Sequence, residues 1–103
     1  LLHAYFNSPD LLERGLPTVH YVADCLNLSP KYLSNLLRVL TGQNTQQHIH
    51  AHLIAKAKEK LSTSSLTVSE IAYGLGFEHL QSFSKLFKTK TNLSPLEFRA
   101  SFN

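Results

Sequence analysis

Residues 69–92, SEIAYGLGFEHLQSFSKLFKTKTN, combine two glycines with aromatic and basic residues at helical spacing. Gly76 lets the chain reverse direction without a Cβ clash, and Phe77 is then expected to enter the core. Gly74 is expected to serve close packing because of its small size. The stretch therefore predicts two short helices that are joined by a tight turn.

An earlier part of the chain repeats this pattern. TVHYVADCLNL (18–28) matches TVSEIAYGLGF (67–77), and LSNLLRVLT (33–41) matches FSKLFKTKT (83–91) when one extra residue is allowed in the second copy. Apolar residues recur in both copies at intervals of three and four, which is typical of amphipathic helices. The sequence thus predicts two helix pairs built on one plan.

The apolar side chains of each helix fall on one face and are expected to point into the core. In the first copy they are Val19, Val22, Ala23 and Leu26, then Leu33, Leu36, Leu37 and Leu40; in the second they are Val68, Ile71, Ala72 and Leu75, then Phe83, Leu86 and Phe87. Phe77 and Phe98 join this set. Cys25 is expected to be a packed, small hydrophobic residue.

Capping residues mark where the helices begin and end. Ser, Thr and Pro favour helix starts, whereas Gly and Asn accept the left-handed conformation that ends a helix. The predicted starts are Ser29-Pro30, Thr67 with Glu70, and Ser94 with Glu97; the predicted stops are Gly42 and Asn92.

A longer helix is expected between the copies, from Thr45 to about Leu61, with a length of roughly 26 Å. Its apolar stripe, which could pack on both neighbours, consists of Ile49, Leu53, Ala57 and Leu61. A short helix is expected at LLHAYF (1–6). A last helix is expected from Pro95 to Phe102, with Leu96, Phe98 and Phe102 available to the core.

The predicted fold class is therefore all-α, with about seven helices and no strand. Two helix-turn-helix subdomains, residues 1–42 and 63–103, are expected to be joined by a linker helix within residues 43–62.

The second helix of each pair, residues 30–40 and 79–89, leaves small polar and basic side chains outside the core. Such a helix, held rigidly by its partner, can enter a DNA major groove about 12 Å wide. Asn and Gln can pair with adenine, Lys with guanine, and Ser with several base edges. The predicted base contacts are Lys31, Ser34, Asn35, Leu80, Gln81, Ser84 and Lys85; the predicted phosphate contacts are Arg38, His79, Lys88 and Lys90.

Some of these residues have a second interpretation. Ser34 and Ser84 can simply be exposed helix residues. Leu80 either meets a thymine methyl group or completes the edge of the core. His79 opens its helix, so it either contacts the DNA or serves the polarity of the helix N-terminus.

Two segments resemble a known family. IAYGLGFEHLQSFSKLFKTKTNLSPLEFR (71–99) closely resembles the signature of the AraC/XylS family of bacterial transcription regulators, and LSPKYLSNLLRVLTG (28–42) resembles the family's first helix-turn-helix. The matching residues are Ile71, Ala72, Gly76, Phe77, Phe83, Phe87, Lys88, Ser94, Pro95 and Arg99. Asn92 stands where the family usually has glycine, and Leu53 where its linker helix commonly has arginine.

The resemblance implies a homeodomain-like, sequence-specific binder of double-stranded promoter or operator DNA, with recognition helices 30–40 and 79–89 in successive major-groove segments. It also implies RNA polymerase as a partner and a cytoplasmic, nucleoid-associated location. The resemblance further implies an effector or signalling domain on the N-terminal side. The lack of methionine and the abrupt start at Leu1 are interpreted as signs of a piece of a longer protein. A complete small regulator is the alternative.

The composition favours few other functions. The net charge of +3 and the sequence pI of about 9.2 lean mildly towards anionic partners. One cysteine excludes an internal disulfide framework, and no apolar run is long enough to span a membrane. No membrane partner is therefore expected.

Catalytic and metal-binding patterns are not visible in the sequence. No nucleophile has a paired base, and there is no carboxylate pair or phosphate-binding glycine loop, so neither an enzyme nor a cofactor is expected. His48 and His52 lie four residues apart but do not complete a zinc site. Together with His50 they are expected on a solvated or phosphate-near helix face.

The remaining alternative from another class is a helical protein-interaction module. Salt separates the two, because DNA binding weakens log-linearly with salt concentration and a protein interface does not.

Overall fold

The computed structural model describes residues 16–101, and this part of the chain is all-helical, as predicted, with no strand. The helices are α3 (Val19–Cys25), α4 (Pro30–Thr41), α5 (Thr45–Thr63), α6 (Val68–Gly74), α7 (Leu80–Thr91) and α8 (Pro95–Ala100). The helix expected at residues 1–6 lies outside the described residues, as does Phe102. Among the described residues, no helix combines the length and apolar character that a bilayer span requires.

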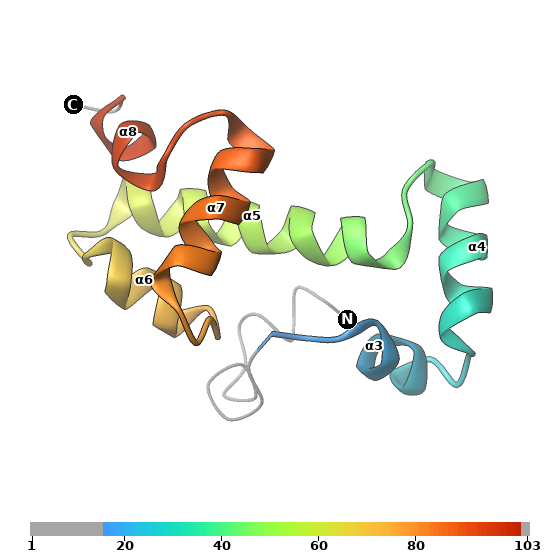
Figure 1. Ribbon diagram of the computed structural model, residues 1–103. Coiled ribbons are helices and arrows are strands. Elements are labelled where there is room, and N and C mark those ends of the chain that lie inside the picture. Colours follow the sequence, from blue (N-terminus) through green and yellow to red (C-terminus); the bar gives the residue numbers. More distant parts are fainter. Residues whose placement is uncertain (1–15, 102–103) are drawn as a thin grey trace.

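Helix α5 is the axis around which the other helices are arranged (Figure 1). Helices α3 and α4 lie at its N-terminal end, whereas α6, α7 and α8 gather around its C-terminal part. Helix α7 crosses α5, whereas α4 stands beyond the N-terminal end of α5, and both have their N-terminal ends at the bottom of the view. Since α5 has 19 residues, it is about 28 Å long and holds α4 and α7 apart.

Side-chain caps fix most of the helix starts. A side-chain oxygen accepts a hydrogen bond from the backbone N–H three residues further on at Thr18, Ser29, Asn44, Thr67 and Ser94. The capping boxes predicted at Thr67 and Ser94 are confirmed. Asn44 and Gln47 form a third box, which starts α5 and which the sequence interpretation missed.

The turn between the paired helices has the same geometry in both copies. Asn27 and Gly76 occupy equivalent positions and have φ values of 57° and 97°. The next residue donates its N–H to the carbonyl five residues earlier, at 2.9 Å in the first copy and 3.1 Å in the second. The turn predicted at Gly76 is confirmed, because a left-handed residue is needed there. The packing role expected of Gly74 is wrong, because a Cβ atom there would meet nothing within 4 Å.

The ends of α4 and α7 also match. Gly42 and Asn92 end these helices in the left-handed conformation, as predicted, with φ of 80° and 65°. The last helical residues, Thr41 and Thr91, each donate a hydroxyl hydrogen bond of 2.8 Å to the carbonyl four residues earlier. Each also accepts the N–H of the residue two further on, at 3.2 Å. The chain therefore leaves both helices along the same path.

Two groups of buried side chains hold the helices together. The first core consists of Val22, Ala23, Leu33 and Ile49. The second core consists of Leu53, Ile54, Ala57, Leu61, Ile71, Ala72, Leu75, Phe77, Phe83 and Phe87. Phe98 packs against the second core, with its ring centroid 5.5 Å from that of Phe87. Tyr21 packs against both cores and so connects them.

The first core is smaller than the sequence predicts. Leu26, Leu36 and Leu40 were expected to point inward but are 48%, 36% and 70% exposed. Leu75, the counterpart of Leu26, is fully buried. Leu75 belongs to the second core, which includes three phenylalanines, whereas Leu26 belongs to neither core.

Two further expectations about burial are wrong. Cys25 is exposed, because it lies about 200° around α3 from the buried Ala23. Leu96 is 66% exposed, since it lies in the first turn of α8 on the side away from Phe98.

Candidate nucleic-acid interface

The predicted contact residues form one stripe on α4 and an equivalent stripe on α7. Both stripes have the spacing i, i+3, i+4, i+7, which keeps their side chains on one face of a helix. Each stripe has four residues. One of them is a half-buried serine, and the other three are exposed polar or basic residues. The stripe residues are Lys31, Ser34, Asn35 and Arg38 in α4, and Gln81, Ser84, Lys85 and Lys88 in α7.

Ser34 is held by the protein itself. Its hydroxyl shares a hydrogen bond of 3.0 Å with the hydroxyl of Thr45, which is 1% exposed at the start of α5. Ser34 thus also satisfies the buried Thr45, and a contact between Ser34 and a base stays a prediction. In the second copy the equivalent of Thr45 is Pro95, which has no hydroxyl to satisfy. A contact between Ser84 and a base stays a prediction.

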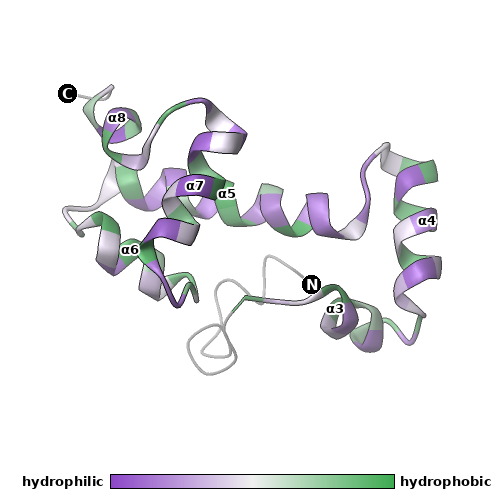
Figure 2. Cartoon of the chain, viewed as in Figure 1, coloured by the Kyte–Doolittle hydropathy of each residue, from purple (hydrophilic) through white to green (hydrophobic). Residues whose placement is uncertain are grey.

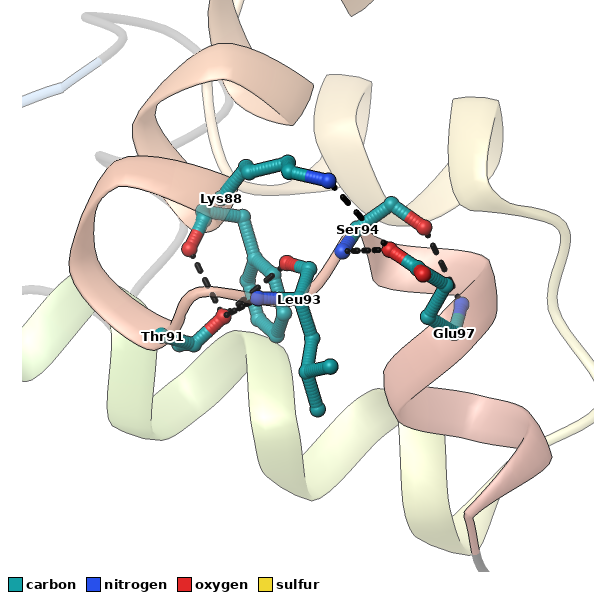
Figure 3. A network of polar contacts seen from close by, with 6 residues as sticks. Lys88, Thr91, Leu93, Ser94 and Glu97 are labelled. Carbon is teal, nitrogen blue, oxygen red and sulfur yellow. Dashed lines mark hydrogen bonds and ion pairs between the residues drawn. The ribbon is translucent and has the colours of Figure 1, made fainter.

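Lys88 takes part in a polar network at the start of α8 (Figure 3). Its Nζ lies 3.6 Å from Oε1 of Glu97, and both side chains are more than half exposed. The same Glu97 oxygen accepts the backbone N–H of Ser94 at 2.8 Å. Lys88 is thus at the protein surface, where a phosphate would compete with Glu97 for it.

His79 is the N-cap of α7 but makes no side-chain capping hydrogen bond. It differs in this from the other N-caps between residues 16 and 101, whose side chains all cap their helices. The first N–H groups of α7 are therefore not satisfied by the His79 side chain, and such groups favour anions. This arrangement is compatible with the phosphate contact predicted for His79.

Two predicted contacts lie away from the α7 stripe. Leu80 packs against the second core, so it completes the core edge, which was one of its two interpretations. Lys90 follows Gln81 by nine residues, or about 2.5 helical turns, and therefore lies on the opposite side of α7. There it lines a hollow beside α5. Lys90 therefore lies on another face of α7 than Lys88, and its contact with a phosphate stays a prediction.

The outer surface of α4 also carries apolar side chains that the contact prediction left out. Tyr32, Val39 and Leu40 are 56%, 84% and 70% exposed, and Leu36 lies beside them. The hydropathy colouring of α4 alternates between polar and apolar bands along the helix (Figure 2). In α7 the counterparts of Tyr32, Val39 and Leu40 are polar, so the two helices differ on this side.

Comparison with known proteins identifies the family of this chain. The family model described as a helix-turn-helix domain matches residues 22–101. The transcriptional activator RhaS of Escherichia coli is 36% identical over 78 residues, which is 76% of this chain and 28% of RhaS. The chain belongs to the AraC/XylS family of transcription regulators.

Solved AraC/XylS-type structures share the fold. The C-terminal domain of AraT, a response regulator from Geobacillus stearothermophilus, is 26% identical with a TM-score of 0.78, over 97% of this chain and 84% of that one. The DNA-binding domain of the global transcriptional factor AdpA, solved with a target DNA, is 25% identical with a TM-score of 0.78, over 98% of this chain and 88% of that one. The described helices therefore match domains that regulate transcription.

Two residues of the AraC/XylS comparison turn out to be structural. Arg99 donates from Nε to the carbonyl of Leu61 at 3.1 Å and from a terminal nitrogen to that of Ser64 at 3.4 Å. It thereby satisfies carbonyls at the end of α5 from a position 38 residues away in the sequence. Leu53, which stands where the family commonly has arginine, is 1% exposed in the second core.

Two histidines of α5 form hydrogen bonds with nearby side chains of the chain itself. His48 Nε2 lies 2.8 Å from the Thr41 hydroxyl and so ties the start of α5 to the end of α4. His50 Nε2 lies 2.8 Å from the amide nitrogen of Gln46. Within residues 16–101 no three or more His, Cys, Asp or Glu side chains come together as metal ligands would.

Proposed function

We propose that the chain binds double-stranded DNA sequence-specifically, with α4 and α7 in two successive major-groove segments on one face of the duplex. The observation that carries this proposal is the pair of equivalent polar stripes on two helices that both run from the bottom to the top of the view in Figure 1. Helix α5 is about 28 Å long, close to the ~34 Å of one turn of B-DNA. A linker helix of this length, with α4 and α7 at different points along it, supports insertion of both helices.

The side chains of the stripes support two kinds of contact, one with bases and one with phosphates. Asn35 and Gln81 are exposed amides that can each pair with an adenine, and Lys31 and Lys85 can reach guanine. Arg38 and Lys88 lie one turn further along their helices, where phosphates are the closer targets. Affinity should therefore fall steeply with salt, because phosphate contacts release counterions.

The similarity to the DNA-binding domain of AdpA supports the proposal that this chain binds DNA. Its domain was solved with a target DNA, and it matches almost the whole chain. The mode of binding proposed for this chain, with two inserted helices, rests on the two stripes described above.

The proposal extends to the organisation of the chain and of the longer regulator. We treat residues 1–42 and 63–103 as two helix-turn-helix subdomains on a linker helix within 43–62, because each half has its own core. The chain spans 28% of RhaS, which supports a role as the output domain of a longer protein. RNA polymerase as a partner and action at the bacterial nucleoid in the cytoplasm belong to the same proposal.

A second candidate function is a protein-interaction module. The exposed apolar side chains Tyr32, Val39 and Leu40 favour it, because apolar groups grouped on a surface mark interaction sites. Binding to DNA should decrease log-linearly with salt, whereas binding through these side chains should not.

Selection from a randomised duplex pool at low salt tests the proposal directly. Enrichment of two short motifs about one helical turn apart is expected. Asn35→Ala should remove information from one motif only, and Gln81→Ala from the other, which assigns each motif to a helix. Retention without enrichment would reduce the function to phosphate binding, and no retention would favour the protein-interaction module.

A further inference from the structure

A hollow of about 360 Å³ lies beside α5, between the loop that follows α4 and the end of α7. This volume is at the small end of the range for ligand pockets, about 300–1,000 Å³. Gln43 contributes from the loop, Lys90 from α7, and α5 provides the remaining wall. The hollow therefore touches both halves of the chain.

One part of the lining of the hollow is apolar and includes two short side chains. Ala51, Ile54 and Ala55 lie at i, i+3 and i+4 along α5, on the same face of the helix. Ile54 belongs to the second core and is 7% exposed, while the two alanines are exposed. Longer side chains at the alanine positions would fill the space, so their small size keeps the hollow open to an apolar group.

The rim of the hollow is cationic. Lys58 and Lys90 line it, and no Asp or Glu does. The acidic neighbour of Lys58 in the sequence, Glu59, pairs instead with Lys56 at 3.7 Å. Neither Lys58 nor Lys90 forms an ion pair with another described residue. Lys58 Nζ lies 5.9 Å from the centroid of the Phe98 ring, so its contact is with an aromatic face and not with a carboxylate. Neither positive charge at the hollow is therefore neutralised by an acidic side chain of residues 16–101.

His50 also lines the hollow, and its pKa is affected by the positive charge of Lys90. Partial burial, and then the charge of Lys90, lower the pKa of His50 below its usual value. The amide nitrogen of Gln46, 2.8 Å from Nε2, can only donate, so His50 accepts this hydrogen bond as a neutral imidazole. The charge of the hollow thus comes from the two lysines.

The hollow does not belong to the proposed DNA surface. Lys90 lies about half a turn around α7 from Gln81, because nine residues make about 2.5 turns. Lys85 is also more than a third of a turn away from Lys90 by the same count. A duplex on the stripe side therefore leaves the hollow open on the other side of α7.

We propose that the hollow binds a small organic anion. Its carboxylate is held by Lys58 and Lys90, and its apolar body lies on Ala51, Ile54 and Ala55. Because Lys90 belongs to α7 and the other groups belong to α5, the ligand ties the end of a proposed recognition helix to the linker helix. This site is independent of the proposed function, since benzoate binding is measured on the chain without DNA and a duplex is added only as a competitor.

Titration of the isotopically labelled 103-residue chain with benzoate, followed by NMR at constant ionic strength, tests this site. We expect saturable shifts at the Ala51, Ile54 and Ala55 methyl groups. Benzamide, which has the same ring without the charge, and acetate, which has the charge without the ring, should each bind at least tenfold more weakly. Equal affinity for benzoate and either analogue would overturn the proposal.

Three variants and one competitor complete the test. Lys58→Gln and Lys90→Gln should each weaken benzoate binding about tenfold, whereas Lys60→Gln should leave it unchanged. Lys60 is the matched control because it lies on α5, two residues from Lys58, and does not line the hollow. Equal effects of all three variants would overturn the proposal. A DNA duplex should bind without displacing benzoate, and displacement would identify the occupant as a DNA phosphate and also overturn it.

Discussion

The hydroxyl groups of Ser34 and Thr45 share a hydrogen bond of 3.0 Å that joins α4 to the first turn of α5. Thr45 is buried, and among the described residues no buried side-chain polar atom lacks a partner. This hydrogen bond therefore fixes the outer face of one proposed recognition helix relative to the linker helix. It has no counterpart in the second copy, where Pro95 replaces Thr45.

Ser34→Ala should lower the free energy of unfolding by about 1–3 kcal/mol, because it leaves the Thr45 hydroxyl buried without a partner. Urea unfolding measures the change. Ser84→Ala is the matched control and should have a smaller effect, since no buried hydroxyl depends on it. The double variant Ser34→Ala, Thr45→Val should recover most of the loss. Equal losses for the two single serine variants would contradict this account.

Replacement by alanine of the glycine in α6 and of the glycine in the following turn should change the stability of the fold in opposite directions. Gly76→Ala should destabilise the fold by about 1–2 kcal/mol, because a left-handed φ of 97° strains any residue with a Cβ atom. Gly74→Ala should stabilise it by up to about 1 kcal/mol, because the methyl group enters open space at the end of a helix. Thermal unfolding of the two variants checks both signs, and destabilisation by Gly74→Ala would show hidden close packing.

Gln81 and Lys88 should affect DNA binding differently. Gln81→Ala should cost about 1–3 kcal/mol on the preferred site and relax one base position, whereas Lys88→Ala should weaken binding to all sequences alike. Lys88→Ala should also reduce the slope of log affinity against log salt by about one unit. Fluorescence titrations on specific and random duplexes measure both quantities. Equal losses on the two duplexes for Gln81→Ala would remove it from the base-reading set.

The Glu97 carboxylate should titrate below its usual value of 4.5. The backbone N–H of Ser94, then its side chain, and then the charge of Lys88 lower this pKa. Because the folded state depresses the pKa, the stabilisation is present above about pH 4.5 and is lost as the pH falls through the folded-state value. NMR titration measures the midpoint.

Two variants separate the causes of the Glu97 shift. Lys88→Gln should raise the midpoint slightly, and Ser94→Ala should raise it as well by removing the cap geometry. Glu97→Gln should flatten the acid side of the stability profile. A Glu97 midpoint at or above 4.5 in the unmodified chain would contradict the hydrogen bonds drawn in Figure 3.

Most of the local structure could be predicted from the sequence, because caps and turns depend on neighbouring residues. Ser29, Thr67, Ser94, Gly42 and Asn92 all act as their residue types predict. Burial was harder to predict, because it depends on which distant element covers a helix. Leu26 and Leu75 occupy equivalent positions in two similar helices, yet only Leu75 belongs to a core.

The candidate site was predicted in outline but not in detail. The stripe positions follow from helical periodicity, which the sequence contains. The hydrogen bond of Ser34 to Thr45 could not be predicted, because Thr45 lies in another helix and its burial is a tertiary property. The position of Lys90 could have been found from the sequence, since nine residues after Gln81 must lie on the opposite side of a regular helix. The hollow beside Lys90 could not.

The unequal sizes of the two cores give the two halves of the chain different lifetimes. Local opening requires less free energy where fewer apolar contacts are lost. Amide hydrogens of α3 and α4 should therefore exchange with solvent before those of α6 and α7. The half with the second core can then stay folded and hold its place on a partner while the other half opens and closes. The order in which the two proposed recognition helices would engage and release a target then depends on the phenylalanines of the second core.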